Sequence, residues 1–277
     1  MIRNTVIISF LLLIGLSACE DVVDVKLDQG PELLVVDGQL TDLPAPDTLT
    51  LSTTAPYFNN AAPPIVTKAA VTLTDNLGNR DTLEETKPGK YLMTRRGQIG
   101  RSYTLRIRLV SGEQYTAQTE IKRPGITDRL VAVFEKPIDD DEGYYAYGFL
   151  REPKGQGDFY RFKSYVNKAL KNLPQDLSFS EDRLVEQPDD LPFNPIDSVR
   201  IGYTLKTGDK VRFEVLSITE DQYNFFTEMI QQTTNGGLFA NPPANVRTNV
   251  RNTDPNGRKA VGYFGGSAVS FKEIVVE

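Results

Sequence analysis

The chain has 277 residues, a net charge of −6 and no histidine. This length is enough for one large domain or two ordinary ones. An acidic chain without a basic cluster is poorly suited to binding nucleic acid, so we expect no nucleic-acid partner. The absence of histidine excludes Ser-His-Asp and Cys-His catalytic groups and histidine-ligated metals, although enzymes can also work with Asp, Glu, Lys or Tyr alone. We predict no metal site, no cofactor and a non-enzymatic protein.

Residues 1–18 have the three-part pattern of an export signal. Arg3 precedes a mostly apolar stretch from Thr5 to Leu16, which is shorter than the roughly 20 residues that a membrane-spanning helix needs. Leu16-Ser17-Ala18-Cys19 is a lipobox, so we expect cleavage between Ala18 and Cys19. The thiol would become a diacylglyceryl cysteine, and palmitate or a similar chain on the new amine would make the anchor stable. Cys19 is the only cysteine, so no internal disulfide is possible.

Residues 19–31 form an acidic tether that contains Glu20, Asp21 and Asp24 and ends at Gly30-Pro31. Such a segment stays solvated rather than folding, which is consistent with a simple spacer. The alternative is a sorting signal, because acidic residues directly behind the lipidated cysteine are typical of surface lipoproteins in one phylum of Gram-negative bacteria. We therefore expect a lipid-anchored protein of the outer membrane, with the cell surface favoured over the periplasmic face.

Residues 32–123 are predicted to form an N-terminal β-sandwich of about seven antiparallel strands. Apolar and polar residues alternate in several short runs, which places one face of each strand on a core and the other in water. Turn-forming residues separate these runs, and no helical pattern lies between them. The clearest runs are 47–52, 69–74 and 102–109, and the clearest turns are 75–79, 87–89 and 111–113.

Residues 124–277 are predicted to form a larger antiparallel β domain that carries one helix. Pro124-Gly125 is typical of a linker. The helix should cover Glu220–Thr233, with a capping box of Thr219 and Gln222 and an apolar stripe packed on a sheet. Residues 169–194 are predicted to be a loop, and Gly265-Gly266 indicates a bulge or bend in the last β segment. The predicted strands are 130–134, 143–151, 158–166, 198–205, 210–217 and 261–276.

A group of tyrosines is the candidate ligand surface of the second domain. Aromatic rings with polar tips suit sugar stacking and peptide recognition, and strand alternation should bury one set in the core and leave the remainder exposed. The candidates are Tyr144, Tyr145, Tyr147, Tyr160 and Tyr165.

Two charged stretches lie near these tyrosines. The basic residues are interpreted as solvated faces, with contact to lipopolysaccharide phosphates as the alternative. The acidic run 139–142 is interpreted as a hairpin tip, because four contiguous acids do not converge on one calcium ion. The basic residues are Arg161, Lys163, Lys168 and Lys171.

The first domain resembles the transthyretin-like and carboxypeptidase-regulatory-like β-sandwich modules. The resemblance rests on about 40 residues, namely Ala70-Val71-Thr72-Leu73-Thr74-Asp75 with Gly78, then Gly89-Lys90-Tyr91, then Gly100 and Tyr103-Thr104-Leu105. Such modules usually bind or dock rather than catalyse.

Nearly the whole mature chain resembles the bacterial lipoprotein family "domain of unknown function 4249". Shared features include Cys19-Glu20, Leu34-Val35-Val36-Asp37-Gly38, the aromatic helix and Leu238-Phe239-Ala240-Asn241-Pro242-Pro243, followed by Asn249 and Val261-Gly262-Tyr263-Phe264. The family implies an outer-membrane lipoprotein, often encoded beside TonB-dependent transporters, but it implies no catalytic or binding residues.

The function expected from these features is a non-enzymatic accessory of a TonB-dependent outer-membrane transporter. It would capture a small-molecule, peptide or glycan ligand, or dock on the transporter, while its lipid holds it to the membrane. One alternative is a hydrolase of surface polymers that uses two carboxylates roughly 5–10 Å apart. Another is an adhesion or scaffolding lipoprotein with a flat apolar patch.

Overall fold

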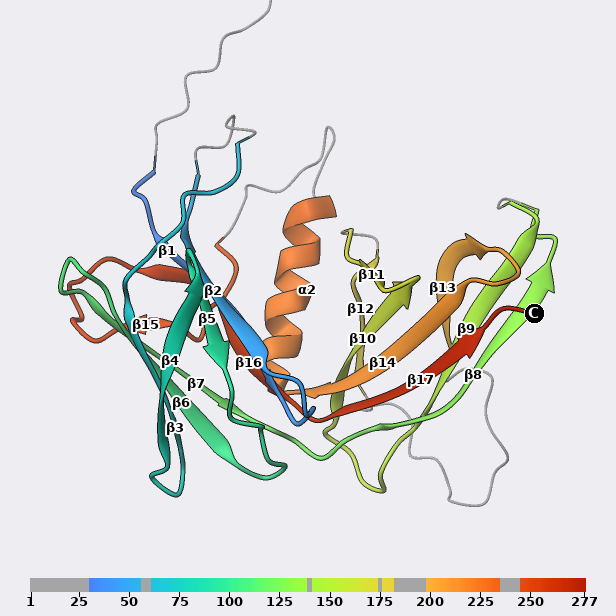
Figure 1. Cartoon of the computed structure of the whole chain (residues 1–277), viewed down its shortest axis with the longest axis horizontal. Coiled ribbons are helices and arrows are strands. Elements are labelled where there is room, and N and C mark those ends of the chain that lie inside the picture. The colour runs from blue at the N-terminus through green and yellow to red at the C-terminus, as the bar shows by residue number, and fades with distance from the viewer. Residues whose placement is uncertain (1–29, 56–60, 139–140, 174–175, 182–197, 235–244) are drawn as a thin grey trace, which may run out of the picture. The chain divides into compact units, whose positions relative to one another are not determined.

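The computed structural model describes residues 30–55, 61–138, 141–173, 176–181, 198–234 and 245–277 (Figure 1). The predicted export signal, Cys19 and the tether up to residue 29 lie outside these ranges, as do Asp139, Asp140 and residues 238–243. The described part of the chain is mostly β-strand with a single helix, so the predicted fold class is confirmed. That helix is not long and apolar enough to cross a membrane.

Seven strands lie between residues 34 and 120, as the alternating pattern predicts. They pair antiparallel in the order β7-β6-β3-β4-β5-β2-β1, and their inward side chains, such as Val71, Leu73 and Leu105, are fully buried. The strands are β1 (Leu34–Thr41), β2 (Asp47–Thr53), β3 (Ala70–Asp75), β4 (Arg80–Lys87), β5 (Lys90–Met93), β6 (Ser102–Arg108) and β7 (Gln114–Glu120).

Two strands from the C-terminal part of the sequence extend the same sheet at its two ends. β16 (Ala260–Ser267) pairs in parallel with β1, and β15 (Arg251–Asn252) pairs antiparallel with β7. The parallel pair departs from the all-antiparallel prediction, because side-chain alternation does not reveal the direction of a strand's partner. Strands from both sides of residue 124 therefore share one sheet, and the predicted boundary itself stays a prediction.

Asn249 connects β7 with β16. Its side-chain amide donates hydrogen bonds to the carbonyl oxygens of Gln118 (2.8 Å) and Phe264 (2.7 Å), and its Oδ1 accepts the Phe264 N–H (3.0 Å). One side chain thus satisfies backbone groups on both strands, which would otherwise be costly to bury. Phe264 itself is fully buried in the sandwich core.

The remaining strands form two further sheets that enclose a second core. β11-β10-β14-β17, with β12 beside β10, is one sheet, and β13-β9-β8 is the other. Tyr160, Phe213 and Ala146 are among the buried residues between them. The strands are β8 (Ile126–Glu135), β9 (Gly143–Arg151), β10 (Phe159–Val166), β11 (Ala169–Lys171), β12 (Ser178–Glu181), β13 (Ser198–Leu205), β14 (Lys210–Ile218) and β17 (Val269–Val275).

The prediction of a loop over residues 169–194 is wrong for two of its segments. β11 and β12 are short strands that both pair with β10. Three or four residues are too few to show a period-2 pattern, so only the neighbouring strand reveals their structure. Residues 182–194 of the predicted loop lie outside the described part of the chain.

The last β segment passes from one sheet to another rather than forming one bulged strand. Of the predicted bulge or bend at Gly265-Gly266, the bulge is wrong, because both residues pair in unbroken register with Gln39 and Leu40 of β1. A Cβ on Gly265 would lie 2.3 Å from side-chain atoms of Gln39 and Gln222, so a larger residue here would displace these two amide groups. The strand changes sheet at Ala268, between β16 and β17.

Helix α2 (Glu220–Thr234) begins and ends within one residue of the prediction. The Gln222 N–H donates to Thr219 Oγ1 (3.2 Å), but the Gln222 side chain does not complete the predicted capping box. Its Nε2 instead donates to Gln39 Oε1 (2.7 Å), because the side chain is buried against β1. Phe226, from the predicted apolar stripe, is buried with Phe159 and Ile218, which confirms that the stripe packs on a sheet.

The turn after β3 generates a testable acid dependence of stability. Asp75 accepts hydrogen bonds from the side chain and N–H of Asn79, from the Leu77 N–H and from Arg101, and these bonds lower its pKa to about 2. The stabilisation of the folded state by the ionised Asp75 carboxylate should be complete above about pH 4 and should be lost as the pH falls through 2. Asp75→Asn should therefore lower the urea midpoint at pH 7 but lose this difference near pH 2.

The matched control is Glu84→Gln, which removes an exposed carboxylate on β4. Its urea midpoint should follow that of the wild-type chain from pH 7 to pH 2. A constant difference between Asp75→Asn and wild type over this range would contradict the assignment.

Candidate functional site

One face of the β10–β14–β17 sheet carries a row of charged and aromatic side chains, called here the polar face. Arg161, Lys163 and Tyr165 alternate along β10 with core residues such as Tyr160 and Phe162. The register places Lys163 opposite Glu214 and Tyr165 opposite Arg212, and Arg212 opposite Glu273. The polar face comprises Arg161, Lys163, Tyr165, Arg212, Glu214, Phe271 and Glu273.

Arg212 organises the centre of the polar face. It donates hydrogen bonds to Glu214 Oε1 (2.7 Å) and Glu273 Oε1 (3.0 Å), and its guanidinium lies 3.6 Å from the centre of the Phe271 ring. A planar cation can bind two carboxylates and stack on a ring at the same time, which an ammonium group cannot do equally well. Both carboxylates are thus hydrogen-bonded to the same guanidinium.

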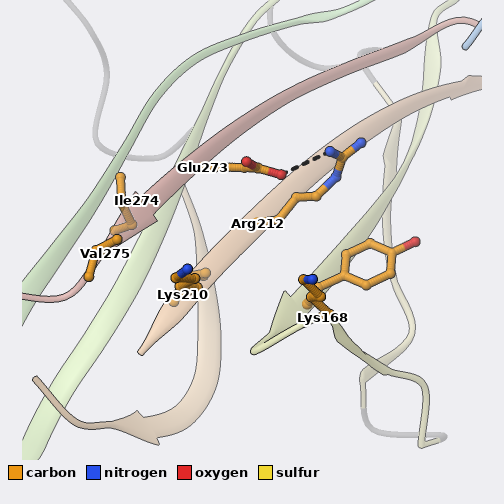
Figure 2. A pocket seen from close by; sticks show the side chains of 8 residues that line it. Lys168, Lys210, Arg212, Glu273, Ile274 and Val275 are labelled. Atoms are coloured by element: carbon orange, nitrogen blue, oxygen red, sulfur yellow. Dashed lines mark hydrogen bonds and ion pairs between the residues drawn. The ribbon is translucent and has the colours of Figure 1, made fainter. Parts of the chain in front are cut away.

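A hollow of about 530 Å³ opens at the end of this sheet. Figure 2 shows Lys168 and Lys210 at the ends of neighbouring strands, with the ion pair of Arg212 and Glu273 farther along the sheet. No residue in the described part of the chain forms an ion pair with either lysine. The lining residues are Tyr165, Lys168, Lys210, Val211, Arg212, Glu273, Ile274 and Val275.

Asn167 holds the two lysines at the same end of the sheet. Its N–H donates to the Lys210 carbonyl (2.8 Å), its Oδ1 accepts the Lys210 N–H (3.0 Å), and its Nδ2 donates to Asp209 Oδ1 (2.8 Å). Asn167 and Lys168 both adopt positive φ, 50° and 69°, which asparagine tolerates better than most residues. The turn that presents Lys168 is therefore fixed to the turn that presents Lys210.

Tyr165 connects the hollow to the rest of the polar face. Its hydroxyl donates to Glu214 Oε2 (3.3 Å), and burial together with the nearby Glu214 charge raises the pKa of Tyr165 to about 12. The phenol therefore stays protonated at neutral pH. It is a fixed hydrogen-bond donor beside a partly accessible ring.

Two further cations lie along β10 beyond Tyr165. Burial lowers the pKa of Lys163, and the adjacent Arg161 charge lowers it further. Burial also lowers the pKa of Arg161, whose Nε is buried without a hydrogen-bond partner and whose guanidinium lies 4.6 Å from the Phe226 ring centre. The positive charge of the hollow thus continues into the partly buried polar face.

The structure separates the five tyrosines proposed as a ligand surface. Tyr145 and Tyr160 are only 2% and 0% exposed, so burial removes them from that surface, as expected for one set of these rings. Tyr144 packs edge-on against Phe134, and Tyr147 donates to Glu135 Oε1 (2.6 Å). Tyr165 alone among the five lines the hollow. A role for Tyr144, Tyr147 and Tyr165 in binding stays a prediction.

The sequence reasoning missed Lys210, Arg212 and Glu273. The alternation Lys210-Val211-Arg212-Phe213-Glu214 contains a usable signal, since a strand that buries Val211 and Phe213 must present the charged residues together on its other face. Glu273 is more than 60 residues away in the sequence, and only strand pairing places it beside Arg212.

The described residues contain no group of three or more aspartate, glutamate, histidine or cysteine side chains placed to hold a metal ion. In a comparison with known protein families, residues 20–273 match the family described as "Domain of unknown function (DUF4249)". No curated protein matches the chain.

The Arg212 cluster gives a testable stability difference. Glu214 is buried, so Arg212→Met would leave its carboxylate without its ion-pair partner and should lower the free energy of unfolding by about 3 kcal/mol. Glu273 has a 61% exposed side chain, so Glu273→Gln should cost less than about 1 kcal/mol. Urea unfolding of both variants at neutral pH measures the difference; equal losses would show that Arg212 does not neutralise Glu214 as described.

Proposed function

The chain belongs to the DUF4249 family, and we propose that it is a non-enzymatic, lipid-anchored protein of the outer membrane that captures a ligand for a TonB-dependent transporter. The lipid would be carried by Cys19, and the β-rich body would present the hollow beside Lys168 and Lys210 to the ligand.

The observation that carries the binding role is a pair of lysines in a hollow of about 530 Å³ that form no ion pair with any described residue. This volume lies within the range of small-molecule sites, roughly 300–1,000 Å³. The wall combines charged groups with the apolar side chains of Ile274 and Val275. Such a combination can orient a ligand by its charge and cover its uncharged part.

The hydrolase alternative finds little support in this hollow. A carboxylate mechanism needs one acid that donates a proton and a second carboxylate that acts as base or nucleophile. Among the residues that line the hollow, Glu273 alone carries a carboxylate, and it is ion-paired with Arg212. Binding therefore explains this arrangement better than catalysis.

The adhesion or scaffolding alternative has one favourable observation. Val133, Phe134 and Ile138, at and after the end of β8, are 44%, 49% and 100% exposed. Exposed apolar side chains of this kind can contribute to a protein contact. A partner bound there would not need the hollow, so variants of the two regions separate the alternatives.

Replacement of Cys19 tests the anchor, because only the cysteine thiol can accept the diacylglyceryl group. The wild-type protein should incorporate labelled palmitate and sediment with outer membranes, whereas Cys19→Ser should do neither. Ser17→Thr, which keeps Cys19, is the matched control and should retain both properties. Unchanged maturation and membrane association of Cys19→Ser would contradict the anchor.

Affinity capture of the native lipoprotein tests the proposed partner. After crosslinking and detergent extraction, mass spectrometry should recover a TonB-dependent transporter with the wild-type protein. Recovery of other outer-membrane proteins without any such transporter would contradict the accessory role.

A further inference from the structure

The residues that line the hollow carry an excess of positive charge, which indicates a negatively charged ligand. Lys168 and Lys210 are held at one end of the sheet by the bonds of Asn167, and neither has an ion-pair partner among the described residues. Like charges that face one hollow repel one another unless an anion lies between them. The Asn167 bonds fix the two turns to each other, so both lysine side chains extend from the same end of the sheet and line the same hollow.

The negative groups around the hollow are already engaged. Glu273 and Glu214 accept hydrogen bonds from Arg212, and Glu214 also accepts one from Tyr165. An entering anion would therefore meet no free carboxylate on the wall. The uncompensated charge of the lining residues is that of the two lysines.

A second, independent observation lies deeper along β10. Lys163 and Arg161 are partly buried cations on the same face as Tyr165, and no ion pair within 4.0 Å joins either to an acid of the described chain. Asp37, Asp47 and Glu214 act on them only at longer range. The Asp47 carboxylate already accepts hydrogen bonds from the N–H and the hydroxyl of Thr41. Burying a charge without a close partner is costly, and an anion in the adjacent hollow would reduce that cost.

We infer that the hollow binds a small ligand carrying a phosphate or carboxylate group, which Lys168 and Lys210 hold from two sides. The uncharged body of the ligand lies against the Tyr165 ring and the Val275 side chain. This inference rests on the proposed capture function and names the ligand class that it would serve. Sugar phosphates and sugar acids both have this chemistry.

Isothermal titration of the full mature lipoprotein in detergent tests the inference. The probes are inorganic phosphate, glucose 6-phosphate, glucuronate and uncharged glucose, each at low and at physiological salt. At least one anionic probe should bind more tightly than glucose by about tenfold or more, and this advantage should shrink as salt rises. The anionic probe that binds best distinguishes a phosphate from a carboxylate ligand.

Two matched double variants assign the effect to the hollow. Lys168→Gln/Lys210→Gln should weaken the best anionic probe by about tenfold or more, the loss expected when a charge-assisted hydrogen bond is removed. Lys87→Gln/Lys90→Gln removes two exposed lysines from the β4–β5 hairpin and makes the same change in net charge. This control should change the affinity by less than about twofold.

The two experiments distinguish a failure of the anionic-ligand inference from a failure of the proposed accessory role. Equal binding of glucose and the anionic probes, or equal losses in the two double variants, would overturn the inference. If no probe binds while affinity capture still recovers a transporter, the anionic-ligand inference is wrong and the accessory role remains. If capture fails while an anionic probe binds through the two lysines, the inference stands and the transporter partner is wrong.

Discussion

The contact between Ser217 and Ala268 is the constraint on which the rest of the structure depends. The Ser217 N–H donates to the Ala268 carbonyl (3.0 Å), the Ala268 N–H donates to Ser217 Oγ (3.0 Å), and Ser217 Oγ contacts the Lys122 carbonyl (3.2 Å). Both Ser217 and Ala268 are almost fully buried. Without these bonds, several backbone groups would be buried without partners, at a cost of about 1–3 kcal/mol each.

This contact lies where one extended segment passes from the nine-stranded sheet into the five-stranded sheet. Before Ala268, β16 pairs with β1; after it, β17 pairs with β14 from Leu216–Val269 to Lys210–Val275. The register that starts beside Ser217 therefore determines which residues meet at the far end of the sheet. It places Arg212 beside Glu273 and forms the wall of the hollow.

The local elements of this fold are predictable from the sequence, but the contacts between them are not. The alternation at Ala70–Asp75 and the apolar stripe of α2 depend on neighbours in the sequence, and both predictions are confirmed. The parallel pairing of β1 with β16 joins residues more than 200 positions apart. Gln222 fits a capping box in its local sequence, yet its side chain reaches Gln39, 183 residues away.

The candidate site shows the same limit. Tyr165 and Lys168 stood out as members of an aromatic and a basic stretch. Strand alternation places Tyr160 and Tyr165 on opposite faces, but only the packing of the sheet shows that Tyr160 lies on the buried face. Lys210 and Arg212 come from β14, and Glu273 comes from the last strand, β17. These residues meet only because of how the strands pair and in which register. A shift of the register by one residue would move every side chain of a strand to the opposite face of the sheet.

The central claim is that the segment through Ala268 makes the described sheets one cooperative unit, and hydrogen exchange of Phe264→Ala tests it most directly. Phe264 is buried in the sandwich core, so its truncation should lower the free energy of unfolding by about 3–5 kcal/mol. If the sheets unfold together, the slowest amides of β14 and β17 should exchange faster by the same factor as those of β1. Faster exchange in β1 and β16 with unchanged protection in β14 and β17 would contradict the claim.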